Sequence, residues 1–69
     1  MDGVTVKELR LRKGMTQVEL GEAIGIHVNA IINWENGKTQ ISDLSRYKVA
    51  AFFGVDPDTI EVNYENGRQ

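Results

Sequence analysis

The sequence contains no cysteine and a single histidine, His27, among its 69 residues. The lack of cysteine excludes disulfide bonds and thiolate metal sites, and one histidine is too few for a zinc cluster. The longest apolar stretches are far shorter than the roughly 20 residues that a membrane-spanning helix needs. We therefore expect a small soluble, cytoplasmic domain, with no cofactor, metal or membrane partner, held together by an apolar core.

Catalytic constellations are also missing from the sequence. It offers no nucleophile partnered by Cys or His, no glycine loop that could cradle a phosphate, and no spacing suited to metal ligands. The acidic residues are scattered over positions typical of solvent or helix caps. We therefore expect a protein that is not an enzyme.

The charges are unevenly distributed along the chain. The net charge is -2, but the segment from Asp56 onward carries -3, which leaves +1 for residues 1–55. The basic side chains gather first at residues 7–13 and again at residues 38–48. A mildly basic body with an acidic tail permits binding to nucleic acid without demanding it.

Two capping boxes dominate the local patterns. Thr5 and Glu8 form the first, and Thr16 and Glu19 form the second, each with the spacing that lets side chain and backbone cap one another. Gly14 and Gly25 follow at the distances expected of helix stops. The sequence therefore predicts one helix from Thr5 to about Lys13 and a second from Thr16 to Gly25.

Three further helices follow from the same kind of signal. We predict one over Val28–Asn36 that Gly37 ends, one from Ser42 through Phe53, and a short fifth one that starts at Asp56-Pro57 around Ile60. From Ile60 the residues alternate between apolar and polar, which favours a short strand-like tail. The expected fold is all-α, with five short helices in a domain over residues 1–60 and an acidic tail over residues 61–69.

Helices two and three are separated by Gly25-Ile26-His27, about the length of a helix-turn-helix corner. Here the sequence resembles the phage repressor and Cro-type family, in the motifs Thr16-Gln17-x-Glu19-Leu20-Gly21-x-x-Ile24-Gly25-Ile26 and Ile31-x-x-Trp34-Glu35-Asn36-Gly37-Lys38. The resemblance covers roughly Val6 to Ile60. It implies a lambda-repressor-like fold that places the third helix in the major groove of double-stranded DNA.

The resemblance implies that three side chains of the third helix read bases, namely Val28, Asn29 and Asn33. Asparagine can pair with adenine through two hydrogen bonds, and an apolar valine suits a thymine methyl group. Half-sites should therefore contain A·T pairs. The alternative for these residues is an ordinary exposed helix face.

The resemblance also implies contacts with the DNA backbone. Gln17 matches a position that holds a phosphate at the start of helix two, His27 lies at the start of helix three, and the following loop contributes Asn36, Lys38 and Thr39. Gln17 could instead be a solvated first-turn residue, and Lys38 an ordinary surface lysine.

Arg10 and Glu35 match a family pair that forms an internal salt bridge, so Arg10 is not counted as a DNA contact. Two residues depart from the family pattern. His27 stands where Ser or Thr usually caps the third helix, which predicts a weakly capped start. Ile32 forms an apolar stripe with Val28, and such a stripe could bind a protein instead, as in an antitoxin or a regulatory adaptor.

The expected function is transcriptional regulation by a bacterial or phage-encoded DNA-binding protein, with repression favoured over activation and no small-molecule ligand. One such domain offers too little contact for tight binding alone, so we expect a homodimer on half-sites about one helical turn apart. The candidate dimer contacts are Ile60, Val62 and Tyr64, unless this end of the chain is frayed.

Overall fold

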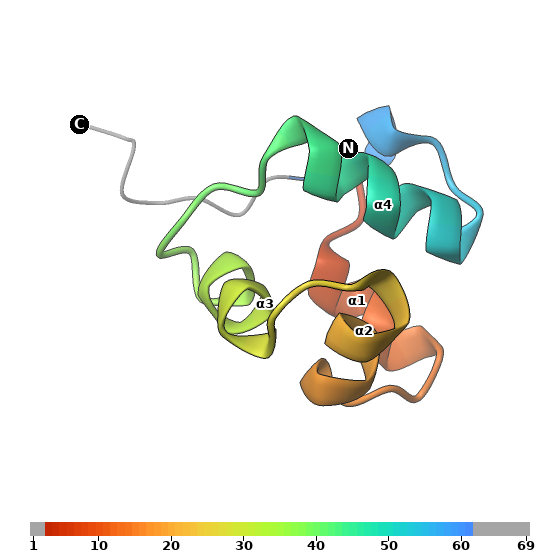
Figure 1. Ribbon diagram of the computed structural model, residues 1–69. Coiled ribbons are helices and arrows are strands. Elements are labelled where there is room, and N and C mark those ends of the chain that lie inside the picture. The colour runs from red at the N-terminus through yellow and green to blue at the C-terminus, as the bar shows by residue number, and fades with distance from the viewer. Residues whose placement is uncertain (1–2, 62–69) are drawn as a thin grey trace.

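The computed structural model describes residues 3–61, and these are helical apart from turns and one isolated bridge (Figure 1). The α-helices are α1 (Val6–Arg12), α2 (Gln17–Ile24), α3 (Val28–Glu35) and α4 (Asp43–Phe53). The all-α class is confirmed. The fifth predicted helix is instead a single turn of 3-10 helix, η1 (Pro57–Thr59), because the chain turns extended again at Ile60.

Both capping boxes are present. Thr5 and Thr16 each accept a hydrogen bond from the backbone N–H three residues on, and Glu8 and Glu19 each accept one from the backbone N–H of the cap residue. At the other ends, the backbone of Gly14 and Gly25 takes the left-handed conformation that stops a helix, with φ of 68° and 72°. Local hydrogen bonds therefore set where α1 and α2 begin and end.

The core lies where all four α-helices meet. Leu20 of α2, Ile31 of α3 and Val49 of α4 have no exposed surface, and α1 contributes Val6 and Leu9. In Figure 1, α4 runs across the top of the molecule with α1, α2 and α3 below it. One side of α4 therefore packs against the core, and its other side faces solvent.

The segment after η1 is fixed to the start of the chain. Val4 and Ile60 form an isolated parallel β-bridge, in which Val4 donates to the Thr59 carbonyl at 2.9 Å and Glu61 donates to the Val4 carbonyl at 2.7 Å. The Ile60 side chain is 3% exposed and belongs to the core. The remainder of the predicted strand-like tail lies outside the described residues.

Within residues 3–61, none of the helices combines the length and apolar character needed to cross a membrane.

Candidate nucleic-acid interface

The third helix has a buried side and a side that reaches the surface. Ile31 is fully buried and Trp34 is 8% exposed, so these two side chains anchor α3 in the core. Asn29 is exposed, and Asn33 and Val28 are half-buried. The three residues expected to read bases therefore remain accessible on one side of α3, while the buried residues on its other side hold the helix in place.

The apolar stripe of Val28 and Ile32 is less open than the sequence suggests. Both side chains are half-buried. The largest apolar exposures lie elsewhere, with Leu44 at 66% and Leu11 at 56%. Val28 and Ile32 therefore expose only a small apolar area on the surface of α3.

His27 caps α3, which corrects the expectation of a weakly capped start. Its backbone is extended, and its ring Nδ1 accepts a hydrogen bond from the Asn29 N–H at 3.1 Å. An acceptor at this position satisfies one of the N–H groups that a helix leaves unpaired at its start. The imidazole thus does the work of the Ser or Thr side chain that it replaces.

The corner between α2 and α3 depends on a close approach at Gly21. The Ile26 N–H donates to the Gly21 carbonyl at 2.9 Å. A β-carbon on Gly21 would lie 2.5 Å from the Ile26 carbonyl oxygen, nearer than non-bonded atoms approach. Together with the left-handed Gly25, the missing side chain of Gly21 allows the two helices to pack at this corner.

A buried ion pair joins α1 to the end of α3. Arg10 donates from Nε to Glu35 Oε2 at 2.8 Å and from Nη2 to Oε1 at 2.9 Å. The side chains are 9% and 3% exposed. The hydrogen bond to Glu35 raises the pKa of Arg10 against the opposing effect of burial. Arg10 therefore carries its positive charge at every pH at which the protein is folded. Arg10 is thereby committed inside the protein, in keeping with the role that the resemblance implies.

Gln17 joins the same network, which sequence reasoning missed. Its Nε2 donates to Glu35 Oε1 at 3.0 Å, so α2 is tied to α3 as well. An amide nitrogen carries two hydrogens, and this bond uses one of them. Gln17 is half-buried at the first residue of α2. Glu35 therefore fixes the amide of Gln17 at the N-terminus of α2, the end at which the helix dipole favours an anion.

The loop after α3 is held to the helix by its own backbone. Lys38 N–H donates to the Asn33 carbonyl at 2.9 Å, and Gly37 N–H donates to the Trp34 carbonyl at 3.2 Å, with Gly37 at a φ of 75°. Asn36, Lys38 and Thr39 are all exposed. The three residues expected to touch DNA backbone thus lie together on a short loop whose position follows α3.

Of the three candidate dimer contacts, Ile60 alone lies within the residues that the structure describes. Ile60 is buried in the core of its own chain, so its side chain offers little surface to a second copy. Val62 and Tyr64 lie outside the described residues. A dimer built on described residues needs another surface.

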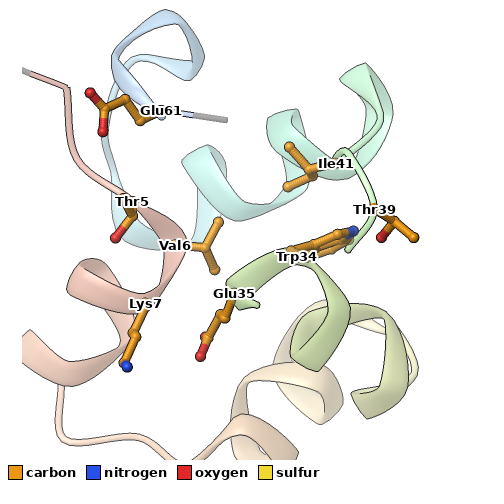
Figure 2. Close-up of a pocket in the computed structure, with 8 residues that line it drawn as sticks. All are labelled: Thr5, Val6, Lys7, Trp34, Glu35, Thr39, Ile41 and Glu61. Carbon is orange, nitrogen blue, oxygen red and sulfur yellow. The ribbon is translucent and has the colours of Figure 1, made fainter. Parts of the chain in front are cut away.

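Figure 2 shows a small pocket between the start of α1, the end of α3 and the loop before α4. Its lining includes Lys7, Trp34, Glu35 and Glu61, and its volume is about 70 Å³. Pockets that hold small organic ligands measure about 300–1,000 Å³. This one has room for a few water molecules.

Comparison with known proteins gives two matches. A family model described as helix-turn-helix matches residues 6–60. The chain is also similar to a type II methyltransferase, M1.ScrFI, of Lactococcus lactis subsp. cremoris, with 40% identity over 57 residues. That similarity covers 78% of this chain and 15% of the methyltransferase, so the chain spans a small part of that relative's length. No solved structure matches the chain.

Proposed function

Because the chain belongs to the helix-turn-helix family, whose domains bind DNA, we propose that it is a sequence-specific transcriptional regulator that binds operator DNA as a homodimer. Its α3 lies in the major groove, and repression is the favoured outcome. The observation that carries the proposal is the two-sided α3, buried through Ile31 and Trp34 and open at Asn29.

Base readout falls to Val28, Asn29 and Asn33. Asn29 and Asn33 are four residues apart, so they occupy neighbouring turns on one side of α3 and can address successive bases. A bidentate bond from asparagine to adenine discriminates by about 1–3 kcal/mol against a wrong base. The preferred half-site therefore contains A·T pairs at two positions.

Backbone contacts hold α3 in register from two sides. Gln17 presents its second amide hydrogen to a phosphate, because Glu35 occupies the first. The loop of Asn36, Lys38 and Thr39 grips the opposite strand, and His27 contributes at the start of α3. With so few cations at this surface, the affinity should fall only gently as salt rises.

The proposed role is binding and not catalysis. The similarity to the methyltransferase spans 15% of that enzyme and, at 78% of this chain, must overlap the family match over residues 6–60. We assign the shared segment to DNA recognition, and the activity in the name of that protein is not carried over to this chain.

A protein-binding role for the Val28/Ile32 face is the other function that the sequence allows. The half-burial of both residues gives it no support. The two roles separate in one titration with mixed-sequence duplex DNA, since a DNA binder shows log K falling with log salt. A chain that binds no duplex at low salt would contradict the proposed function.

The decisive experiment is a selection of binding sites from random duplex DNA, repeated with Asn29→Ala and Asn33→Ala. Each variant should lose preference at one base position and keep the others. Thr39→Ala serves as the matched control, because loss of a backbone contact weakens all sequences alike. Uniform weakening by all three variants would remove both asparagines from readout.

A further inference from the structure

His27 is the single histidine of the chain, and it stands where the proposed recognition helix begins. Two hydrogen bonds start α3 at this residue. The Ala30 N–H donates to the His27 carbonyl at 3.0 Å, and the Asn29 N–H donates to the ring Nδ1 at 3.1 Å. The second bond depends on the protonation of the ring as well as on its position.

The ring Nδ1 can accept this bond only while it carries no proton. A protonated imidazole has an N–H on both nitrogens and accepts at neither. Imidazole is also the side-chain group that ordinarily changes charge between about pH 5 and pH 8. Because His27 is exposed, protons from the solvent reach the ring directly. The cap of α3 is therefore sensitive to acid.

The caps of the other α-helices lack this property. Thr5, Thr16 and Ser42 accept through hydroxyl oxygens, which remain hydrogen-bond acceptors when the solution is acidified. Among the four α-helices that the structure describes, α3 is therefore the one whose side-chain cap acid can remove.

Few charged groups surround His27. On α3 the one charged residue is Glu35, at the far end of the helix, where it is bonded to Arg10. From α2, Glu22 lines the same open hollow as His27 and is the one other titratable residue of that hollow. Within residues 3–61, no hydrogen bond or ion pair joins Glu22 to the ring. The bond from Asn29 is therefore the contact of the ring that protonation changes.

A positive charge on His27 would act on α3 and on DNA in different ways. The first turn of α3 would lose the bond that caps it, and a cation would stand at the helix end whose dipole disfavours positive charge. The same cation would lie at the surface proposed to face DNA, where it attracts phosphate whatever the base sequence. The first effect weakens the reading of bases by Val28 and Asn29, and the second strengthens binding to any duplex.

We propose that His27 makes base reading by α3 dependent on pH. When the ring is neutral, α3 is capped and discriminates between sequences. When the ring is protonated, the domain holds duplex DNA through one more cation and discriminates less. Acidification thus moves the protein from selected sites to general binding. This rests on the proposed function, because the device acts on the residues that are assigned to readout there.

Two-dimensional NMR of the free chain tests the cap without any DNA. Between about pH 8 and about pH 5, the amide signal of Asn29 should move together with the ring signals of His27, because the bond between them is lost. The Glu19 amide is the internal control, since it donates to the Thr16 hydroxyl at 3.0 Å, and its signal should not follow the ring.

Urea unfolding over the same pH range measures what the cap contributes. The unfolding equilibrium constant should rise on acidification by about fivefold more in the wild type than in His27→Asn, because asparagine caps a helix without titrating. The variant also subtracts every pH effect that does not come from the ring, since the chain has no second histidine.

Binding to a selected and to a mixed-sequence duplex measures the consequence for function. The ratio of the two affinities should fall by about two- to tenfold on acidification of the wild type. Its affinity for the mixed duplex should rise, and the slope of log K against log salt should steepen by about 0.9, the value for one additional phosphate contact. His27→Asn should keep the same ratio and the same slope at both ends of the range.

The outcomes separate this proposal from the proposed function. A ratio that falls in the wild type and stays constant in His27→Asn supports the proposal. It is overturned by an Asn29 amide that stays in place while the ring titrates, by a ring that does not titrate in this range, or by an equal fall of the ratio in both chains. Absence of binding to either duplex at any pH, with a cap that still titrates, would contradict the proposed function alone.

Discussion

The two helices of the motif have equal length, eight residues each, yet they are held in different ways. α2 is fixed by its own neighbourhood, with the Thr16 capping box at its start and left-handed Gly25 at its end. α3 starts from a histidine cap, and its last residue, Glu35, is bound by Arg10 of α1 and Gln17 of α2. The difference shows that α3, the proposed recognition helix, is held at its end by side chains of α1 and α2.

The largest expected effect comes from Glu35→Gln, which keeps the shape of the side chain but removes its charge. Arg10 would remain buried without a counter-ion, and breaking a buried pair in this way costs about 3–5 kcal/mol. Urea unfolding followed by circular dichroism measures the loss. Hydrogen exchange of backbone amides should speed up more in α3 than in α2.

Asp43→Asn is the control for this prediction. Its pair with Arg46 joins residues three apart and leaves the Asp43 side chain 85% exposed, so its loss should cost less than about 1 kcal/mol. Equal costs for the two variants, or equal exchange in α2 and α3, would mean that the network does not position the recognition helix.

The corner between the two helices should show the next largest effect. Gly21→Ala gains up to about 1 kcal/mol of helix propensity, but its new β-carbon would meet the Ile26 carbonyl at 2.5 Å. Overpacking of this kind costs about 1–3 kcal/mol, so we expect a net loss of stability.

Urea unfolding also measures this change, with Glu22→Ala as the control on the exposed side of the same helix. That substitution should stay within about 0.5 kcal/mol of the wild type. A Gly21→Ala variant that is more stable than the wild type would show that the corner can open at no cost.

The smallest effects should come from the caps, and there the two helices can be compared directly. Thr16→Ala and His27→Ala each remove one side-chain acceptor and should cost about 1 kcal/mol of unfolding free energy. Their effects on DNA should differ, because His27 caps the turn that carries Val28 and Asn29. Thr16→Ala should weaken all duplexes alike, whereas His27→Ala should reduce discrimination between sequences.

Binding to selected and mixed duplexes measures this contrast. His27→Asn, which retains a capping side chain, should restore most of the discrimination. Identical profiles for the alanine variants at Thr16 and His27 would mean that the start of α3 needs no cap to read bases.

The sequence predicted those parts of the fold that depend on hydrogen bonds between near neighbours. Thr5 with Glu8 and Thr16 with Glu19 are three residues apart, and Gly14 and Gly25 stand within two residues of the helix ends, so each signal could be read within one turn. The Arg10–Glu35 pair spans 25 residues and became visible through the family resemblance and not through spacing.

The parts that escaped prediction depend on segments that are distant in the chain. Nothing near Gln17 indicates that its amide binds Glu35, 18 residues away. The sequence made Ile60 a candidate contact with another copy, but Ile60 pairs with Val4 of the same chain, and its side chain is buried. A histidine cap was missed because the usual cap residues are Ser, Thr, Asp and Asn.

The cap at His27 also decides which tautomer the ring adopts. A nitrogen that accepts a hydrogen bond must hold its lone pair free, so a ring that caps α3 through Nδ1 has its N–H at Nε2. His27 is exposed, and it directly precedes Val28 and Asn29, two of the residues proposed to read bases. By bonding to Nδ1, the backbone N–H of Asn29 leaves the Nε2–H of His27 as a hydrogen-bond donor at the start of α3. A phosphate oxygen can accept such a hydrogen bond.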